Sequence, residues 1–181
     1  MKTFNEFINE GVRHLMTPKS EEEILYFLNN IKDPNELLLV SSKKDFLIGV
    51  KKALELGADI HYENDFSLRQ ASYKGYKDVV ELLLKNGADV HAIDDYALRN
   101  ASSNGHKDVV ELLLKNDADV HALDDSSLIH ASEYGHKDVV ELLLKNGADV
   151  HTYNDAPLRW ASTNNYKDVV ELLKTWIKKP K

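Results

Sequence analysis

Residues 106–122 read HKDVVELLLKNDADVHA, and closely related strings occur at three other places in the chain. YKDVVELLLKNGADVHA begins at Tyr76, HKDVVELLLKNGADVHT begins at His136, and a truncated YKDVVELLKTW begins at Tyr166. One position of the string recurs every 30 residues, at Gly57, Gly87, Asp117 and Gly147. A period of this length is typical of a stacked repeat protein, in which neighbouring units bury a continuous core.

Each unit contains two helical patterns. In the first, Leu98, Ala101 and Ser102 follow one another at helical spacing, which predicts a short amphipathic helix. In the second, KDVVELLLKN places two valines and two leucines on one face and ends at Asn116, before a position suited to left-handed backbone. An aspartate precedes each first helix and is the predicted N-cap, at Asp65, Asp95, Asp125 and Asp155.

These residues resemble a known family. GHKDVVELLLKNGADV at residues 135–150 is similar to the second helix and exit turn of an ankyrin repeat, and YALRNAS stands where that family has TPLHLAA. The resemblance covers residues 35 to about 177 and implies an all-α, ankyrin-like solenoid of helix-turn-helix repeats. Ankyrin repeats are usually about 33 residues long. The three missing residues fall between Ala92 and Tyr96, where the family has a β-hairpin, so we expect short turns with little or no strand.

The chain divides into three parts. We predict that residues 1–18 form an N-terminal leader or short amphipathic helix. Within residues 19–34, SEEEILYFLNN opens with a capping box from Ser20 to Glu23 and predicts a capping helix. Residues 35–181 hold the repeats, which start with a degenerate unit and end in a basic cap. Atypical terminal units shield the open ends of a stack from water.

The composition of the chain argues against several classes of function. The 181 residues are 43% hydrophobic and 29% charged, as in folded soluble proteins. The formal net charge of -7 argues against a general nucleic-acid binder. There is no cysteine, which excludes disulfides and thiolate zinc sites. No apolar run reaches the length of a membrane span, so we expect no membrane association.

A histidine follows each exit turn GADV, DADV or GADI, at His61, His91, His121 and His151. Successive units stack about 10 Å apart, whereas zinc needs each ligand nitrogen at about 2 Å, and one ion needs ligands that converge. We therefore expect no metal site and interpret each histidine as a turn residue whose ring bonds neighbouring backbone. No phosphate-binding loop, nucleophile elbow or kinase motif is present, so we predict no enzyme and no cofactor.

Positions that vary between units are free to recognise a partner, because the constant positions already build the stack. In the ankyrin family, the first helices and the turns before them line a concave face that grips a protein partner. Aromatic side chains commonly dominate such interfaces. Arg69, Arg99 and Arg159 would form a basic row along the stack, which Ile129 interrupts. Carried onto this chain, the predicted protein-binding residues are Arg69, Tyr73, Tyr96, Arg99, Asn100, Asn104, His130, Tyr134, Tyr153, Arg159 and Trp160.

The first ten residues, MKTFNEFINE, lie outside the repeat. They resemble the capsid-targeting leader of internal head proteins of T-even-type tailed phages, which a head protease cuts after its last glutamate. Ile8, Glu10 and Gly11 match that pattern in place, which implies cleavage between Glu10 and Gly11. The 30-residue units also resemble the ankyrin-like repeats of large DNA viruses.

Two functional classes follow from these resemblances. The first is a non-catalytic, monomeric binding module of viral or phage origin that acts on a host protein in the host cytoplasm. The second is a structural component packed in the interior of the virion. A leader of this kind would serve both classes.

Overall fold

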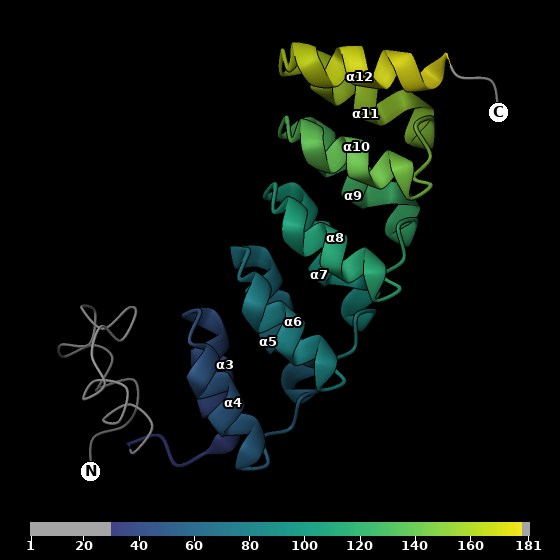
Figure 1. The fold of residues 1–181 in the computed structure, drawn as a ribbon. Coiled ribbons are helices and arrows are strands. Elements are labelled where there is room, and N and C mark those ends of the chain that lie inside the picture. The colour runs from purple at the N-terminus through teal and green to yellow at the C-terminus, as the bar shows by residue number, and fades with distance from the viewer. Residues whose placement is uncertain (1–29, 179–181) are drawn as a thin grey trace.

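The computed structural model describes residues 30–178, and within that range the chain is a stack of helices without strands (Figure 1). The helices pair into five units of two. The pairs are α3 (Pro34–Lys43) with α4 (Leu47–Glu55), α5 (Tyr62–Lys74) with α6 (Lys77–Lys85), α7 (Ala92–Ser103) with α8 (Lys107–Lys115), α9 (Ala122–Glu133) with α10 (Lys137–Lys145), and α11 (Thr152–Thr163) with α12 (Lys167–Ile177).

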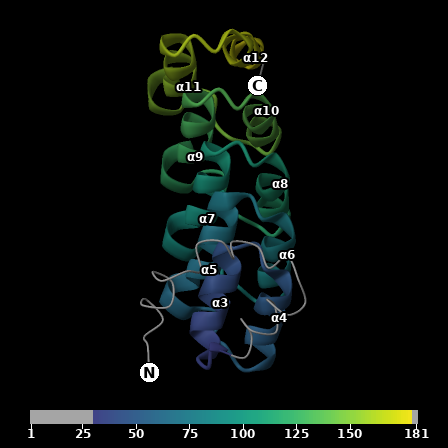
Figure 2. The ribbon, with the colours of Figure 1, turned by 90° about the vertical axis from the view of Figure 1, so that its left-hand side faces the viewer.

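The helices form two layers, which appear as two columns in Figure 2. Odd-numbered helices pack on one another from α3 to α11, and even-numbered helices pack on one another from α4 to α12. In Figure 1 the helices fan out from the edge that carries the turns within the units, so this edge lies inside the curve of the stack. The expected all-α stack of helix-turn-helix repeats is confirmed.

The second helices form because their sequence suits both a helix and a core. KDVVELLLK recurs in α6, α8 and α10, and in α8 it buries Val109, Val110 and Leu113. On the outer face, Lys115 Nζ lies 2.7 Å from the carboxylate of Glu111 one turn earlier. α8 ends at Lys115, Asn116 is its C-cap, and Asp117 then takes a left-handed φ of 67°. The left-handed end predicted from the glycine pattern is therefore confirmed at the unit that has Asp117 in place of the glycine.

The turns within units join each unit to the next. Gly105 is left-handed, with φ 73°, and a Cβ atom there would lie 2.5 Å from Nδ1 of His136 in the following unit. The same ring donates from Nε2 to the carbonyl oxygen of Ser103, at 2.9 Å. His106 makes the equivalent bond to the carbonyl oxygen of Tyr73, at 3.0 Å. Glycine is needed here because the ring of the next unit occupies the space of its side chain.

The turns between units extend into the first residues assigned to α5, α7, α9 and α11, where three consecutive residues are left-handed and not helical. Ile93, Asp94 and Asp95 have φ of 54°, 52° and 54°, and the equivalent residues of three other units do the same. Such backbone costs about 1–2 kcal/mol per residue, and few non-glycine residues adopt it. This compact turn replaces the hairpin, which confirms that the shortened period removes the strands.

The aspartates before the first helices bond the next unit and do not cap their own helix, which corrects the N-cap prediction. The buried carboxylate of Asp95 accepts a hydrogen bond from the backbone N–H of Asp119 in the next unit, at 2.8 Å. Asp65 and Asp125 make the same bond to Asp89 and Asp149. No first-turn N–H of the described first helices bonds these side chains, because the left-handed turn directs them toward the following unit.

The rings of the histidines that follow the exit turns bond a carboxylate. This corrects the prediction that these rings bond neighbouring backbone. Nδ1 of His91 lies 3.2 Å from both carboxylate oxygens of Asp95, and the other three histidines pair with the aspartate four residues later. In three of the four pairs the ring lies beside a buried carboxylate, that of Asp65, Asp95 or Asp125, whereas the side chain of Asp155 in the fourth pair is about half exposed. The histidine therefore supports the aspartate that links two units.

The N-terminal predictions lie outside the described residues. These are the leader in residues 1–18, the cleavage between Glu10 and Gly11, and the capping box from Ser20 to Glu23. Of residues 19–34, the structure describes 30–34, and α3 begins at Pro34. The side chain of Asp33 caps this helix by accepting a hydrogen bond from Asn35 N–H at 2.9 Å. Among the described helices, none is long and apolar enough to cross a membrane.

Candidate protein-binding surface

The predicted binding residues divide between two edges of the stack. One edge carries the C-terminal ends of the first helices and the turns within units, and it faces the viewer in Figure 2. The opposite edge carries the left-handed turns between units.

The first edge contains a groove of about 520 Å³ that spans three units. Tyr73 of α5 and Tyr134 at the end of α9 stand at its two ends, with side chains 40% and 50% exposed. Its other lining residues are Asn100, Ser103, Asn104 and His136. Four of the predicted binding residues, Tyr73, Asn100, Asn104 and Tyr134, therefore lie together around one hollow.

The groove exists because the middle unit has small side chains between two aromatic ones. Ser103 stands at the position of Tyr73, and Asn104 stands at the position of Tyr134. His136 adds a ring beside Tyr134, with centroids 6.5 Å apart. Its Nε2 is held by the carbonyl oxygen of Ser103, so the ring is fixed in place.

The two asparagines give the groove its polar character. Asn104 Nδ2 donates to the carbonyl oxygen of Asn100 at 2.8 Å, and Asn100 Nδ2 donates to that of Tyr96 at 2.9 Å. Each amide thus directs a donor to its own helix and keeps its side-chain oxygen as an acceptor. Acceptors between two aromatic rings suit a peptide segment that offers N–H donors and apolar side chains.

Two further predicted residues lie in the same column as Asn100. The half-buried His130 has its Nδ1 3.2 Å from the hydroxyl of Ser126 one turn earlier. Trp160 of α11 is 43% exposed. Neither residue lines the groove, and Trp160 lies two units along from Asn100.

The predicted arginine row lies at the opposite edge and is held by the chain itself. Arg99 Nε donates to the carbonyl oxygen of Asp94 at 2.9 Å, and its Nη2 donates to that of Ile93 at 3.0 Å. Its guanidinium also lies 5.3 Å from the ring centroid of Tyr96. Arg69 makes the same two bonds to its own turn, and Arg159 makes one. These guanidiniums stabilise the left-handed turns.

Tyr153 is the remaining predicted residue at this edge. Its ring is 61% exposed, and its hydroxyl donates to a carboxylate oxygen of Asp124 in the preceding unit, at 3.0 Å. This hydrogen bond, with the negative charge of Asp124, raises the pKa of the Tyr153 hydroxyl. The bond fixes an exposed aromatic ring beside an exposed carboxylate.

Comparison with known proteins identifies the repeats. A family model described as ankyrin repeats (3 copies) matches residues 98–179, and a model described as ankyrin repeats (many copies) matches residues 68–114. Residues 68–179 belong to the ankyrin-repeat family. No curated protein matches the chain significantly.

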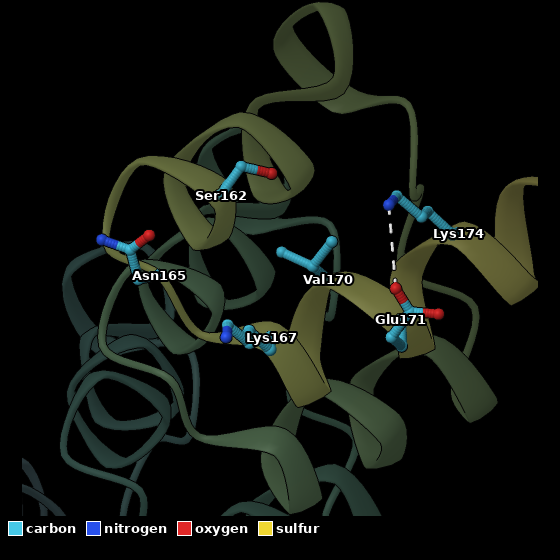
Figure 3. A pocket seen from close by; sticks show the side chains of 6 residues that line it. All are labelled: Ser162, Asn165, Lys167, Val170, Glu171 and Lys174. Carbon is cyan, nitrogen blue, oxygen red and sulfur yellow. Dashed lines mark ion pairs between the residues drawn. The ribbon is translucent and has the colours of Figure 1, made fainter.

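A second hollow, of about 430 Å³, lies on the last ankyrin unit between α11 and α12 (Figure 3). Lys174 Nζ lies 3.7 Å from the carboxylate of Glu171, and the half-buried Val170 faces the hollow. In the preceding unit the equivalent Val140 is fully buried. The hollow is therefore the surface that packs against a following unit elsewhere in the ankyrin stack.

Within residues 30–178, no group of three or more histidine, aspartate or glutamate side chains could hold a metal ion. The histidine–aspartate pairs of the ankyrin units run along the stack and do not converge on one point.

Two groove residues were missed from the sequence. Ser103 belongs to the varying positions but is small, so nothing marked it. His136 stands at a position that is aromatic or histidine in every full unit, which favoured a packing role. Only the fold shows that it also lines the groove.

Proposed function

We propose that this chain is a non-catalytic binding protein that holds a segment of a partner protein in the groove between Tyr73 and Tyr134. Ankyrin repeats indicate a protein-binding module. The groove supports this assignment because it collects four of the predicted residues in one hollow at the inner edge of the curve.

The groove fits a short peptide better than a small metabolite. It is open and spans three units, whereas sites for small molecules usually enclose most of the ligand. Its two tyrosines are rigid anchors, and side chains of this type contribute much of the affinity of protein interfaces. The cationic Lys74 Nζ lies 5.1 Å from the ring centroid of Tyr73 and adds a positive charge at one end.

Parallel capture of proteins tests this proposal. The wild-type chain, a variant with Tyr73→Ser and Tyr134→Ser, and a control with Tyr62→Ser are immobilised and exposed to the same cell lysate. Tyr62 is also an exposed tyrosine, but it lies at the opposite edge. We expect proteins that bind the wild type and the control but not the groove variant. Binding that is equal in all three samples would contradict the proposal.

We also propose that the partner is a host protein and that the chain is viral or phage-encoded. This rests on the resemblance of MKTFNEFINE and on the 30-residue period. Mass spectrometry of infected cells and of purified particles tests it. Because the leader would serve both classes, presence in particles alone does not separate them. A host protein recovered in complex with the chain from infected cells would support the host-directed module, whereas a chain that is found in particles and holds no host protein in infected cells would favour the virion component.

A further inference from the structure

The left-handed turns between units share one means of support. In three units an arginine of the following helix donates to carbonyl oxygens of the turn. In two of these units, both Nε and Nη2 donate, at 2.9–3.0 Å. A guanidinium is planar and offers several donors, which suits two neighbouring carbonyl oxygens.

The turn formed by Leu123, Asp124 and Asp125 is the exception. Its backbone has the same left-handed geometry, with φ of 49°, 54° and 58°. Ile129 stands where the other units have arginine, so no guanidinium of its own helix reaches it. Instead, Thr152 Oγ1 of the next unit donates to the carbonyl oxygen of Asp124, at 2.8 Å. No described side chain donates to the carbonyl oxygen of Leu123, the equivalent of the Nη2 acceptor in the other turns.

The surroundings of this turn add two groups that favour a cation. The carboxylate of Asp124 is exposed, and the hydroxyl of Tyr153 donates to it. The ring of Tyr153 is itself exposed and fixed by that bond. Aromatic rings attract guanidinium groups, and in this chain Arg69 already lies 5.4 Å from the ring centroid of Tyr96.

We propose that the turn at residues 123–125, together with Tyr153, binds an arginine side chain supplied by a protein partner. The incoming guanidinium takes the place that the chain's own arginines take in the other turns. The carbonyl oxygen of Leu123 and the carboxylate of Asp124 accept its hydrogen bonds, and the ring of Tyr153 packs against its face. The site lies at the edge opposite the groove, so it does not depend on the groove.

Nuclear magnetic resonance with a minimal probe tests this site. The probe is N-acetyl-arginine-N-methylamide, and its uncharged control is the citrulline analogue, which has nearly the same shape. We expect saturable amide shifts in residues 122–126 and 152–154 with the arginine probe, with a dissociation constant of about 10 mM. The citrulline analogue should cause no saturable shift. Equal shifts with both probes, or none with arginine, would overturn the proposal.

Two variants separate the site from a general attraction to an acidic protein. Ile129→Arg restores the chain's own guanidinium and should remove the shifts while the fold is retained. Asp124→Asn keeps the shape of the turn and removes its charge, and should weaken the probe at least fivefold. Shifts that persist unchanged in Ile129→Arg, or in a folded Asp124→Asn, would show that the probe binds elsewhere.

Discussion

Asp117 shows how one residue tests the geometry of a turn. It holds a left-handed φ of 67° at the position where three other units have glycine. Glycine adopts this backbone without steric cost, whereas another residue loses on the order of 1 kcal/mol, somewhat less for aspartate. The exposed side chain of Asp117 makes none of the described hydrogen bonds that would offset that loss.

We therefore predict that Asp117→Gly stabilises the protein by up to about 1 kcal/mol. Its thermal unfolding midpoint should rise by about 2 °C relative to the wild type. Gly87→Asp is the matched reverse change, because Gly87 has φ 90° and open space around its Cβ position. It should lower the midpoint by a similar amount. An unchanged or lowered midpoint in Asp117→Gly would contradict the left-handed assignment.

The four histidines that follow the exit turns are explained by the aspartates that they contact. A buried carboxylate is costly unless hydrogen bonds satisfy it. Asp95 receives one bond from the next unit and lies beside the ring of His91. From the sequence, we expected the ring to bond backbone. The error arose because the partner lies four residues later in a turn whose left-handed path the sequence pattern did not indicate.

At the scale of the element, the left-handed turn needs support beyond its own backbone. Its three residues would each favour other conformations, and β-branched Ile93 does so most strongly. Two hydrogen bonds from Arg99 to the turn compensate for part of this cost. We predict that Arg99→Ile destabilises the protein by about 1–2 kcal/mol, since bonds from a charged donor typically contribute on this order.

Chemical denaturation measures this prediction through the unfolding midpoint. Arg99→Lys is the control, because lysine keeps the charge but cannot donate to both carbonyl oxygens with one planar group. It should lie between the wild type and Arg99→Ile. A midpoint for Arg99→Ile that equals that of the wild type would show that the arginine does not support the turn.

At the scale of the whole molecule, the repeat predicted the stack but not the surface. The 30-residue period and the apolar face of KDVVELLLK were enough to predict that helices pair into stacked units, because each unit must bury that face against a neighbour. The arginines illustrate what the period could not show. They look like a basic row in the sequence, and only the turn geometry reveals that each of them already donates to its own turn.

The groove was only partly predictable for a related reason. Variation between units identified Tyr73, Asn104 and Tyr134 one by one. Which of them share a hollow depends on which side chains are small in the unit between them, and on the ring of His136. Sequence periodicity describes equivalent positions, whereas a groove combines positions that are not equivalent.

Constant positions build the stack, and we propose that the groove binds the partner. The most direct measurement is the affinity of Tyr134→Ala for a captured partner, together with its circular dichroism. We predict an unchanged helical spectrum and a dissociation constant about thirtyfold higher, since an interface anchor commonly contributes about 2 kcal/mol. Leu113→Ala, a fully buried core position, should instead lose about 2–5 kcal/mol of stability and reduce binding only through unfolding. An unchanged affinity in Tyr134→Ala, or loss of its helical fold, would contradict the account.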